Sequence, residues 1–212
     1  MFFAAYMYDS AGTPVWYAAT LKANGSNSYS GSLMQYSGGQ TLGGSFHAPS
    51  GSAPVGSVQL AFTSRTTANL LITGSGLEPT NAAIQRYAIV PNGLSSPPTA
   101  AQPQTGWWWN PAEAGRGYFL EVQNGAVFFA GYMYDVSGKA IWYAAQSGLT
   151  SDSSFSGTLV QYGNGQILGG SYKTASVVNS NVGAVSLQFS SPSVGTLVLP
   201  NGTQIPIQRY TF

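Results

Sequence analysis

The chain has 212 residues, of which only 6% are charged, against about 25% in an average soluble domain. Its formal net charge is +1, so it lacks the basic surface that nucleic acids or anionic membranes bind, and we expect neither as a partner. There are no cysteines, which excludes disulfides, thiolate metal sites and cysteine nucleophiles. No segment approaches about 18 uninterrupted apolar residues, so we expect no membrane-spanning helix.

The sequence contains the same pattern twice, at an offset of 126 residues. Residues 2–19 match residues 128–145 at 12 of 18 positions, with the shared skeleton F-F-A-x-Y-M-Y-D-x-x-G-x-x-x-W-Y-A-A. Residues 30–46 match residues 156–172 at 11 of 17 positions, including Q-Y-x-x-G-Q-x-L-G-G-S. Self-similarity at a fixed period indicates repeated structural units, so we predict a tandem duplication.

The two repeats differ at their start. The second opens with G-W-W-W-N-P-A-E-A-G-R-G at residues 106–117, and the first has no matching segment. We therefore predict a first repeat at residues 1–90 without its opening strand segment, a linker at residues 91–105, and a complete second repeat at residues 106–212. A repeat without its opening hairpin should leave a strand edge unpaired, which the linker, the second repeat or another molecule would complete.

Short runs rich in β-branched and aromatic residues, separated by turn residues, predict strands throughout, with no sustained helical periodicity. In the first repeat Asp9–Gly12 has the pattern of a type I turn, as has Asp135–Gly138 in the second, and Asn124-Gly125 is a two-residue hairpin signal. The fold class is therefore all-β, a tandem duplicated antiparallel meander that is up-and-down and barrel-like, with a β-sandwich as the alternative. In the first repeat the later strands are expected at residues 15–20, 29–36, 40–46, 57–63, 68–73 and 83–90.

Several of the predicted strands are apolar on both faces. Alternation places Phe128, Tyr132 and Tyr134 on one face of their strand and Phe129 and Met133 on the other. Such strands need cover on both sides, or they enclose an interior of ligand size.

Residues 106–145 resemble a β-repeat of uncharacterised, exported bacterial proteins, which is marked by G-W-W-W-N-P-A-E-x-G-R-G, a β-hairpin, and Y-x-Y-D-x-x-G followed by W-Y. The first repeat carries only the later part of this motif. The resemblance implies a bacterial β-module that is secreted or displayed at the cell surface, often as an accessory, and it implies no particular reaction. The first residues of the chain lack the basic start of a signal peptide, so we expect any export signal to lie outside this sequence.

The tryptophan-rich opening of the second repeat is the candidate ligand-binding site. Adjacent tryptophans can form a flat platform on which sugar rings or other planar ligands stack. The alternative is that alternate tryptophans close the barrel end or cover a neighbouring core. The candidate ligand-binding residues are Trp107, Trp108, Trp109, Asn110, Glu113 and Arg116.

Weak catalytic candidates are the carboxylates of Glu113 and Glu121, which could divide acid and base roles as in glycoside hydrolysis. The alternative is a Glu113–Arg116 ion pair within the loop, with Glu121 bound to a buried partner. His47 is the only histidine, so neither a catalytic triad nor a His-rich zinc site is expected. We expect no cofactor and no metal, and we interpret the Gly-Gly pairs as bends rather than phosphate loops.

Four charged residues recur in both repeats, where charges are otherwise scarce. We expect structural ion pairs between Asp9 and Arg86 and between Asp135 and Arg209, because arginine suits a bidentate carboxylate contact. The alternative is that each aspartate caps its own turn.

The leading functional hypothesis is a non-catalytic binding or adhesion module, whose ligand is a carbohydrate or a small apolar molecule. The first alternative is a hydrolase that uses Glu113 and Glu121. The second is a structural protein that self-associates, forming a homo-oligomer through the open sheet edge. An outer-membrane barrel is disfavoured, because residues 154–157 and 169–171 interrupt the apolar band that lipid-facing strands need.

Overall fold

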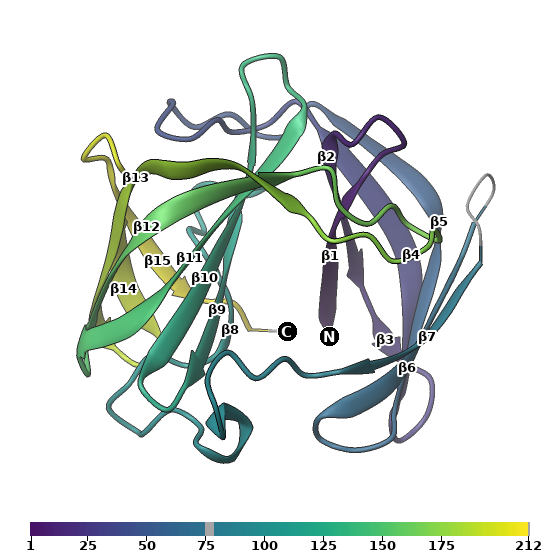
Figure 1. Ribbon diagram of the computed structural model, residues 1–212, viewed down its shortest axis with the longest axis horizontal. Helices are drawn as coiled ribbons and strands as arrows, with labels where there is room; N and C mark the ends of the chain where they lie inside the picture. The colour runs from purple at the N-terminus through teal and green to yellow at the C-terminus, as the bar shows by residue number, and fades with distance from the viewer. Residues whose placement is uncertain (75–78, 212) are drawn as a thin grey trace.

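The computed structural model describes residues 1–74 and 79–211, which form two antiparallel sheets lying side by side (Figure 1). The first sheet is curled and open, and the second closes into a barrel. This confirms the predicted all-β, barrel-like architecture. The first sheet consists of β1 (Phe2–Tyr8), β2 (Pro14–Thr20), β3 (Lys22–Ala23), β4 (Ser28–Ser37), β5 (Gly51–Phe62), β6 (Thr67–Thr73) and β7 (Thr80–Gln85).

The barrel follows the order β10-β11-β12-β13-β14-β15-β8-β9, so that the last strand pairs with the first and the sheet closes. A short 3₁₀ helix, η1 (Gly93–Ser95), lies between the two sheets in the sequence. The barrel strands are β8 (Gly106–Trp109), β9 (Gly117–Gln123), β10 (Ala126–Tyr134), β11 (Ala140–Ser151), β12 (Ser154–Gly163), β13 (Ser176–Ser191), β14 (Val194–Val198) and β15 (Gln204–Arg209).

The interior of the barrel is filled by side chains, as is usual for eight strands. Trp108, Tyr118, Leu120 and Val122 from the β8–β9 hairpin are all completely buried there, against inward-facing residues of the other strands. The interior is therefore a packed core, and any ligand site must lie elsewhere.

The first sheet is the same meander without its opening hairpin. Its strands β1, β2, β4, β5, β6 and β7 occupy the places of β10 to β15, but nothing in the described ranges corresponds to β8 and β9. The sheet order consequently ends at β1 on one side and at β7 on the other. In the barrel, the β8–β9 hairpin lies between β15 and β10, the strands that correspond to β7 and β1.

The two sheets pack through the outer faces of β1–β2 and β10–β11. The ring of Tyr6 stacks on the equivalent ring of Tyr132, with centroids 3.9 Å apart and planes 8° from parallel. Trp16 contacts Tyr132 at 5.4 Å, and its counterpart Trp142 contacts Tyr6 at 5.1 Å. The contacts are thus related by an approximate twofold symmetry. The outer apolar faces of these strands, which the sequence predicts to need cover, cover each other.

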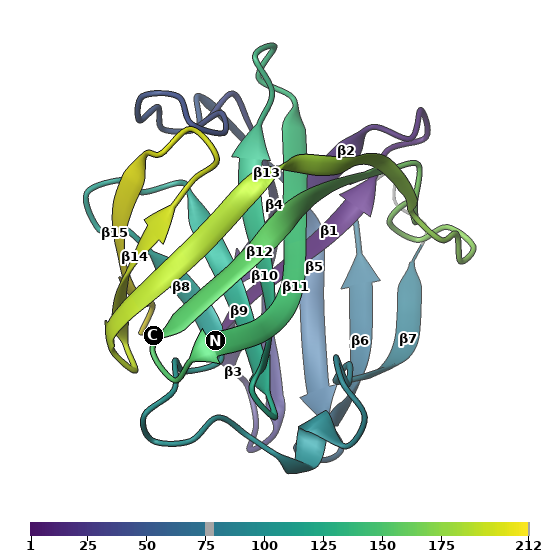
Figure 2. The ribbon, with the colours of Figure 1, turned by 60° about the vertical axis from the view of Figure 1, so that its left-hand side comes forward.

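Each sheet also sends a loop into the other. The backbone N–H of Tyr134 donates to the carbonyl of Gln40, and the N–H of Tyr8 donates to the carbonyl of Gln166. Beyond these bonds, Leu42 packs against the barrel core and Leu168 is buried in the core of the first sheet. Both crossing loops are visible in Figure 1 and Figure 2, one in slate blue over the barrel and one in green over β4 and β5.

The prediction of a strand at residues 40–46 is wrong, because this segment is the crossing loop. The side chain of Gln40 replaces strand pairing: its amide donates to the carbonyl of Gly44 at 2.6 Å, and its oxygen accepts from the N–H of His47 at 2.7 Å. Gln166 makes the same bonds to Gly170 and Lys173. The shared Q-x-L-G-G-S sequence therefore encodes a loop that is stabilised by its own glutamine side chain and that inserts a leucine into the other repeat.

The last strand of the first repeat ends earlier than predicted, at Gln85 rather than near Val90. The chain then leaves the sheet and binds the outer surface of the barrel, where the side chain of Gln123 accepts from the N–H of Ile89 and donates to the carbonyl of Tyr87. The tryptophan-rich opening of the second repeat is itself the strand β8.

The turn predictions are confirmed. The N–H of Gly12 donates to the carbonyl of Asp9, the N–H of Gly138 donates to that of Asp135, and Asn124-Gly125 joins β9 to β10 as a two-residue turn.

The predicted ion pairs Asp9–Arg86 and Asp135–Arg209 are wrong, because each aspartate caps its own turn by accepting backbone N–H bonds. Arg86 instead pairs with Glu121 at 2.5 Å. Arg209 donates to the backbone carbonyls of Thr105, Trp107 and Tyr210. Oδ1 of each aspartate takes these bonds, which hold the carboxylate at its own turn and away from the distant arginine.

Residues 1–74 and 79–211 contain no helix that is long and apolar enough to cross a membrane.

We predict that Leu168→Ala destabilises the protein by about 2–3 kcal/mol, because it removes a buried side chain from the core of the first sheet. Chemical denaturation followed by circular dichroism measures the free energy of unfolding. The control is Ile167→Ala, since Ile167 is 38% exposed on the same loop and should change this energy by less than about 0.5 kcal/mol. Equal effects of the two substitutions would contradict the inserted-leucine interpretation.

Candidate functional site

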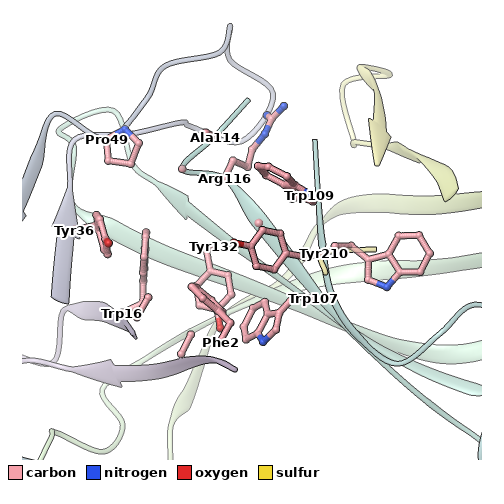
Figure 3. Close-up of a pocket in the computed structure, with 15 residues that line it drawn as sticks. Phe2, Trp16, Tyr36, Pro49, Trp107, Trp109, Ala114, Arg116, Tyr132 and Tyr210 are labelled. Carbon is pink, nitrogen blue, oxygen red and sulfur yellow. The ribbon is translucent and has the colours of Figure 1, made fainter. Parts of the chain in front are cut away.

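A cavity of about 330 Å³ lies where the first sheet meets the opening hairpin of the second repeat. Its walls come from β1, β2 and β4 on one side, and from β8, β10 and the loop between β8 and β9 on the other (Figure 3). The aromatic pocket, as we call this cavity, is therefore assembled from both repeats.

The first repeat supplies one wall of the aromatic pocket. Trp16 on β2 stacks on Tyr36 on β4, with centroids 5.2 Å apart and planes 19° from parallel. Phe2 on β1 meets Trp107 of the second repeat edge-on at 5.2 Å. In Figure 3 Trp16 and Tyr36 stand together on one side, opposite Trp107 and Trp109.

The three consecutive tryptophans of β8 have different surroundings, because successive side chains of a strand point to opposite faces. Trp107 points outward onto Phe2 and Tyr132, and Trp109 points outward against Tyr210. Trp108 points into the barrel, is completely buried, and donates its indole N–H to the carbonyl of Gln104. Although Trp108 borders the pocket, its indole belongs to the barrel core, so the alternative of a core role holds for this residue.

The N-P-A-E-A-G-R-G loop forms the rim of the pocket. The side chain of Asn110 accepts from the N–H of Ala112 and caps the turn, and Arg116 pairs with Glu113. Gly115 has a φ of +100°, and a Cβ atom there would lie 2.2 Å from Cδ of Pro49 in the first repeat. Only glycine combines this backbone conformation with such a close approach.

Two residues that line the pocket have buried N–H groups with no acceptor among the residues that the structure describes. They are Arg116, whose Nε is unpartnered although the residue is 5% exposed, and Trp16, whose indole Nε1 is unpartnered. A buried donor without an acceptor costs about 1–3 kcal/mol. The equivalent indole Nε1 of Trp142, which does not border the pocket, is unpartnered as well, so the buried indole N–H is a feature of both repeats and does not mark the pocket.

A second hollow of about 380 Å³ adjoins the aromatic pocket on the outer face of the first sheet. Both cavities share Phe2, Ala18 and Tyr36, and the second adds hydroxyl and amino groups from Thr20, Lys22, Ser30 and Ser32. The aromatic pocket thus continues into a more polar depression.

The weak catalytic candidates are not brought together. Glu113 is bound to Arg116 in the rim, whereas Glu121 is bound to Arg86 and to the side-chain amide of Gln123. Glu121 lies four residues beyond Gly117 on β9, about 13 Å along the strand, and neither glutamate borders the pocket. His47 is exposed, and the described residues contain no cluster of three or more possible metal ligands.

The sequence candidates account for only one wall of the pocket. Of the six ligand-binding candidates, Trp107, Trp108, Trp109 and Arg116 line the pocket, whereas Asn110 and Glu113 do not line it and instead shape the rim. The residues that the sequence reasoning missed are Phe2, Trp16, Tyr36, Tyr132 and Tyr210. Their signal was the apolar second face of the repeated strands. No protein-family model, no curated protein and no solved structure matches this chain.

We predict that Trp108→Ala lowers the free energy of unfolding by about 3–5 kcal/mol, because it empties the largest buried side chain of the barrel core. Trp109→Ala is the matched control, since the neighbouring indole lies outside the barrel and its loss should cost about 1 kcal/mol. Thermal and urea unfolding of both variants measure the difference. Equal losses would contradict the assignment of Trp108 to the core.

We predict that the protein loses stability above pH 10 because its interface tyrosines stay neutral while it is folded. Burial raises the pKa of Tyr6 and of Tyr132 well above 10, and burial raises the pKa of Tyr8 to about 12. Between pH 10 and the folded pKa the unfolded chain has lost protons that the folded chain keeps. Each such tyrosine then lowers the free energy of unfolding by up to about 1.4 kcal/mol per pH unit.

Tyrosinate absorbance and denaturation curves across this pH range provide the measurement. The double variant Tyr6→Phe, Tyr132→Phe should lose stability less steeply than the original protein. Full ionisation of the tyrosines while the sheets remain intact would contradict the buried interface.

Proposed function

We propose that the chain is a non-catalytic binding module of an exported bacterial protein, and that it binds a carbohydrate in the aromatic pocket. The observation that carries this proposal is the arrangement of tryptophan, tyrosine and phenylalanine rings from both repeats around a cavity of about 330 Å³. This volume is at the lower end of the range for small-molecule sites, which are mostly apolar with a few polar groups.

The rings favour a ligand with flat apolar faces. Trp16 and Tyr36 form one stacked pair, and Trp107 stands across the cavity from them. Aromatic faces and edges of this kind bury the C–H faces of a sugar ring while its hydroxyl groups remain directed outward.

Hydroxyl groups beside the aromatic pocket favour a ligand that also carries oxygen atoms. The adjoining hollow is lined by Thr20, Ser30 and Ser32, and a sugar offers ring and hydroxyl oxygens to such groups. A purely apolar ligand would displace water from these hydroxyl groups without replacing its hydrogen bonds. The carbohydrate is thus favoured over a small apolar molecule.

The adjoining polar hollow favours an extended ligand. A second sugar unit leaving the aromatic pocket past Phe2 and Tyr36 would meet the hydroxyl groups of Ser30 and Ser32 and the ammonium group of Lys22. An oligosaccharide would therefore gain contacts that a monosaccharide lacks.

The placement of the carboxylates supports binding without hydrolysis. Glycoside hydrolysis needs two carboxyl groups that face one glycosidic bond, within about 10 Å of each other. Glu113 and Glu121 are each held in a separate ion pair and neither borders the aromatic pocket.

We predict that oligosaccharides quench or shift the tryptophan fluorescence of the protein saturably, and that Trp16→Phe weakens this binding about tenfold or more. The test is a fluorescence titration with cello-, chito- and malto-oligosaccharides, with fatty acids as the apolar comparison. Phenylalanine keeps an aromatic ring at position 16 but removes the larger indole surface on which the ligand would stack.

The matched control is Trp142→Phe. Trp142 occupies the equivalent position in the second repeat and stacks on Tyr162 as Trp16 stacks on Tyr36, but it does not border the pocket. Its substitution should leave the affinity within about twofold. Equal losses in the two variants would overturn the location of the site. Binding of fatty acids without any response to oligosaccharides would overturn the ligand class.

A further inference from the structure

The polar hollow, as we call the second cavity beside the aromatic pocket, contains one charged side chain. Among the described residues, Lys22 is the only charged one that lines the hollow, and Arg116 is the only charged one that lines the aromatic pocket. Arg116 is paired with Glu113, whereas Lys22 makes no ion pair with the residues that the structure describes. The joined cavities therefore carry a positive charge at one end that no neighbouring carboxylate compensates.

Strand alternation places Lys22 on the same face as the aromatic residues of the pocket. Trp16, Ala18, Thr20 and Lys22 follow one another at every second position, and Ala18 lines both cavities. On the neighbouring strand β4, Ser30 pairs with Lys22. At about 3.3 Å per residue, the chain spans about 20 Å from Trp16 to Lys22. The two cavities thus form one elongated trough with an aromatic end and a cationic end.

The lysine is a feature of this face that the second repeat does not share. The equivalent of Trp16 is Trp142, which stacks on its tyrosine partner at the same centroid distance of 5.2 Å. The equivalent of Lys22, at the same offset of 126 residues, is Gly148. The aromatic pair is therefore common to both repeats, whereas the charge is present only in the repeat whose aromatic pair borders the pocket.

The same face of the second repeat is covered by the chain that follows β7. The side-chain amide of Gln146 donates to the carbonyl of Ile89 at 3.1 Å, and Ile89 is buried. The equivalent of Gln146 in the first repeat is Thr20, which is exposed, as are Lys22 and Ser32. A ligand that extends from the aromatic pocket can therefore reach the ammonium group of Lys22.

We propose that the bound carbohydrate is an acidic oligosaccharide, with a carboxylate or sulfate ester group that pairs with the ammonium group of Lys22. This inference rests on the proposed function, because it adds a charge preference to the same site. A lysine ammonium group binds such oxyanions as a compact point charge. The hydroxyl group of Ser30 accepts from the side-chain amide of Asn24 at 3.0 Å, which leaves its O–H to donate to the same oxyanion.

The length of the trough makes the charge preference depend on the length of the ligand. The span of about 20 Å between Trp16 and Lys22 exceeds the distance of about 8 Å over which physiological salt screens charges. A single acidic sugar in the aromatic pocket therefore gains nothing from Lys22. An oligosaccharide that extends along the trough brings its acidic group into direct contact with the lysine.

The test compares oligogalacturonides of increasing length with their methyl esters, which carry the same rings without the charge. Calorimetry at low salt should show the acidic hexamer binding about three- to fivefold more tightly than its ester, as one exposed ion pair allows. This preference should fall below about twofold in 1 M salt. Monomeric galacturonic acid should show no preference over its ester. Sulfated galactan oligosaccharides and their desulfated counterparts test the sulfate ester in the same way.

Three variants assign the preference to its residue. Lys22→Gln should abolish the preference but leave the affinity for the ester within about twofold, which also shows that the pocket is intact. Lys22→Arg keeps the charge and should keep the preference. Lys173→Gln is the matched control, because Lys173 is exposed on the crossing loop of the second repeat, lines neither cavity, and loses the same charge. It should retain the preference.

The outcomes separate this inference from the proposed function. Binding of the neutral esters without any gain for the carboxylate or sulfate series would overturn the charge preference and leave carbohydrate binding in place. Equal losses in Lys22→Gln and Lys173→Gln would assign the preference to net charge and overturn the role of Lys22. The full preference in monomeric galacturonic acid would overturn the placement of the acidic group in the polar hollow. No binding of any oligosaccharide would overturn both proposals.

Discussion

The arrangement of the whole molecule depends on strands that are apolar on both faces. The inner faces of β1–β2 and β10–β11 cover the cores of their own sheets, and their outer faces carry tyrosine and tryptophan that water would solvate poorly. Each pair of strands covers the outer face of the other, centred on the stack of Tyr6 on Tyr132. The crossing loops strengthen this contact, because Leu42 and Leu168 each pack into the opposite repeat. The two repeats therefore form one folded unit, in which neither core is complete without residues from the other.

The opening hairpin of the second repeat has two structural roles. They fall to different residues, because successive side chains of a strand point to opposite faces. Trp108 and the inward residues of β9 close the barrel, while Trp107 and Trp109 point outward and form a wall of the aromatic pocket. The following loop is shaped by local contacts and by Gly115, which lets it approach Pro49 of the first repeat. The G-W-W-W-N-P-A-E-x-G-R-G motif thus encodes barrel closure and pocket formation together, and its residues cannot be assigned to one task as a group.

The duplication, the strands and the turns could be predicted because they depend on local patterns. Asp9 and Asp135 illustrate both the strength and the limit of such patterns: the turns were correct, but the ion partners were not, because Arg86 binds Glu121 in the other repeat. The strand predicted at residues 40–46 is a crossing loop, because this segment is held by the side chain of Gln40, and alternation along the sequence does not reveal such support. Trp16 and Tyr36 are not among the predicted pocket residues, because the apolar second face of a strand shows that it needs cover but not which distant segment covers it.

The aromatic pocket lies beside only one of the two equivalent tryptophan–tyrosine pairs of the described residues, and the β8–β9 hairpin explains why. The pair Trp142–Tyr162 repeats the geometry of Trp16–Tyr36, with centroids again 5.2 Å apart. What this second pair lacks is a tryptophan strand opposite it, since the described residues of the first sheet include no counterpart of the β8–β9 hairpin.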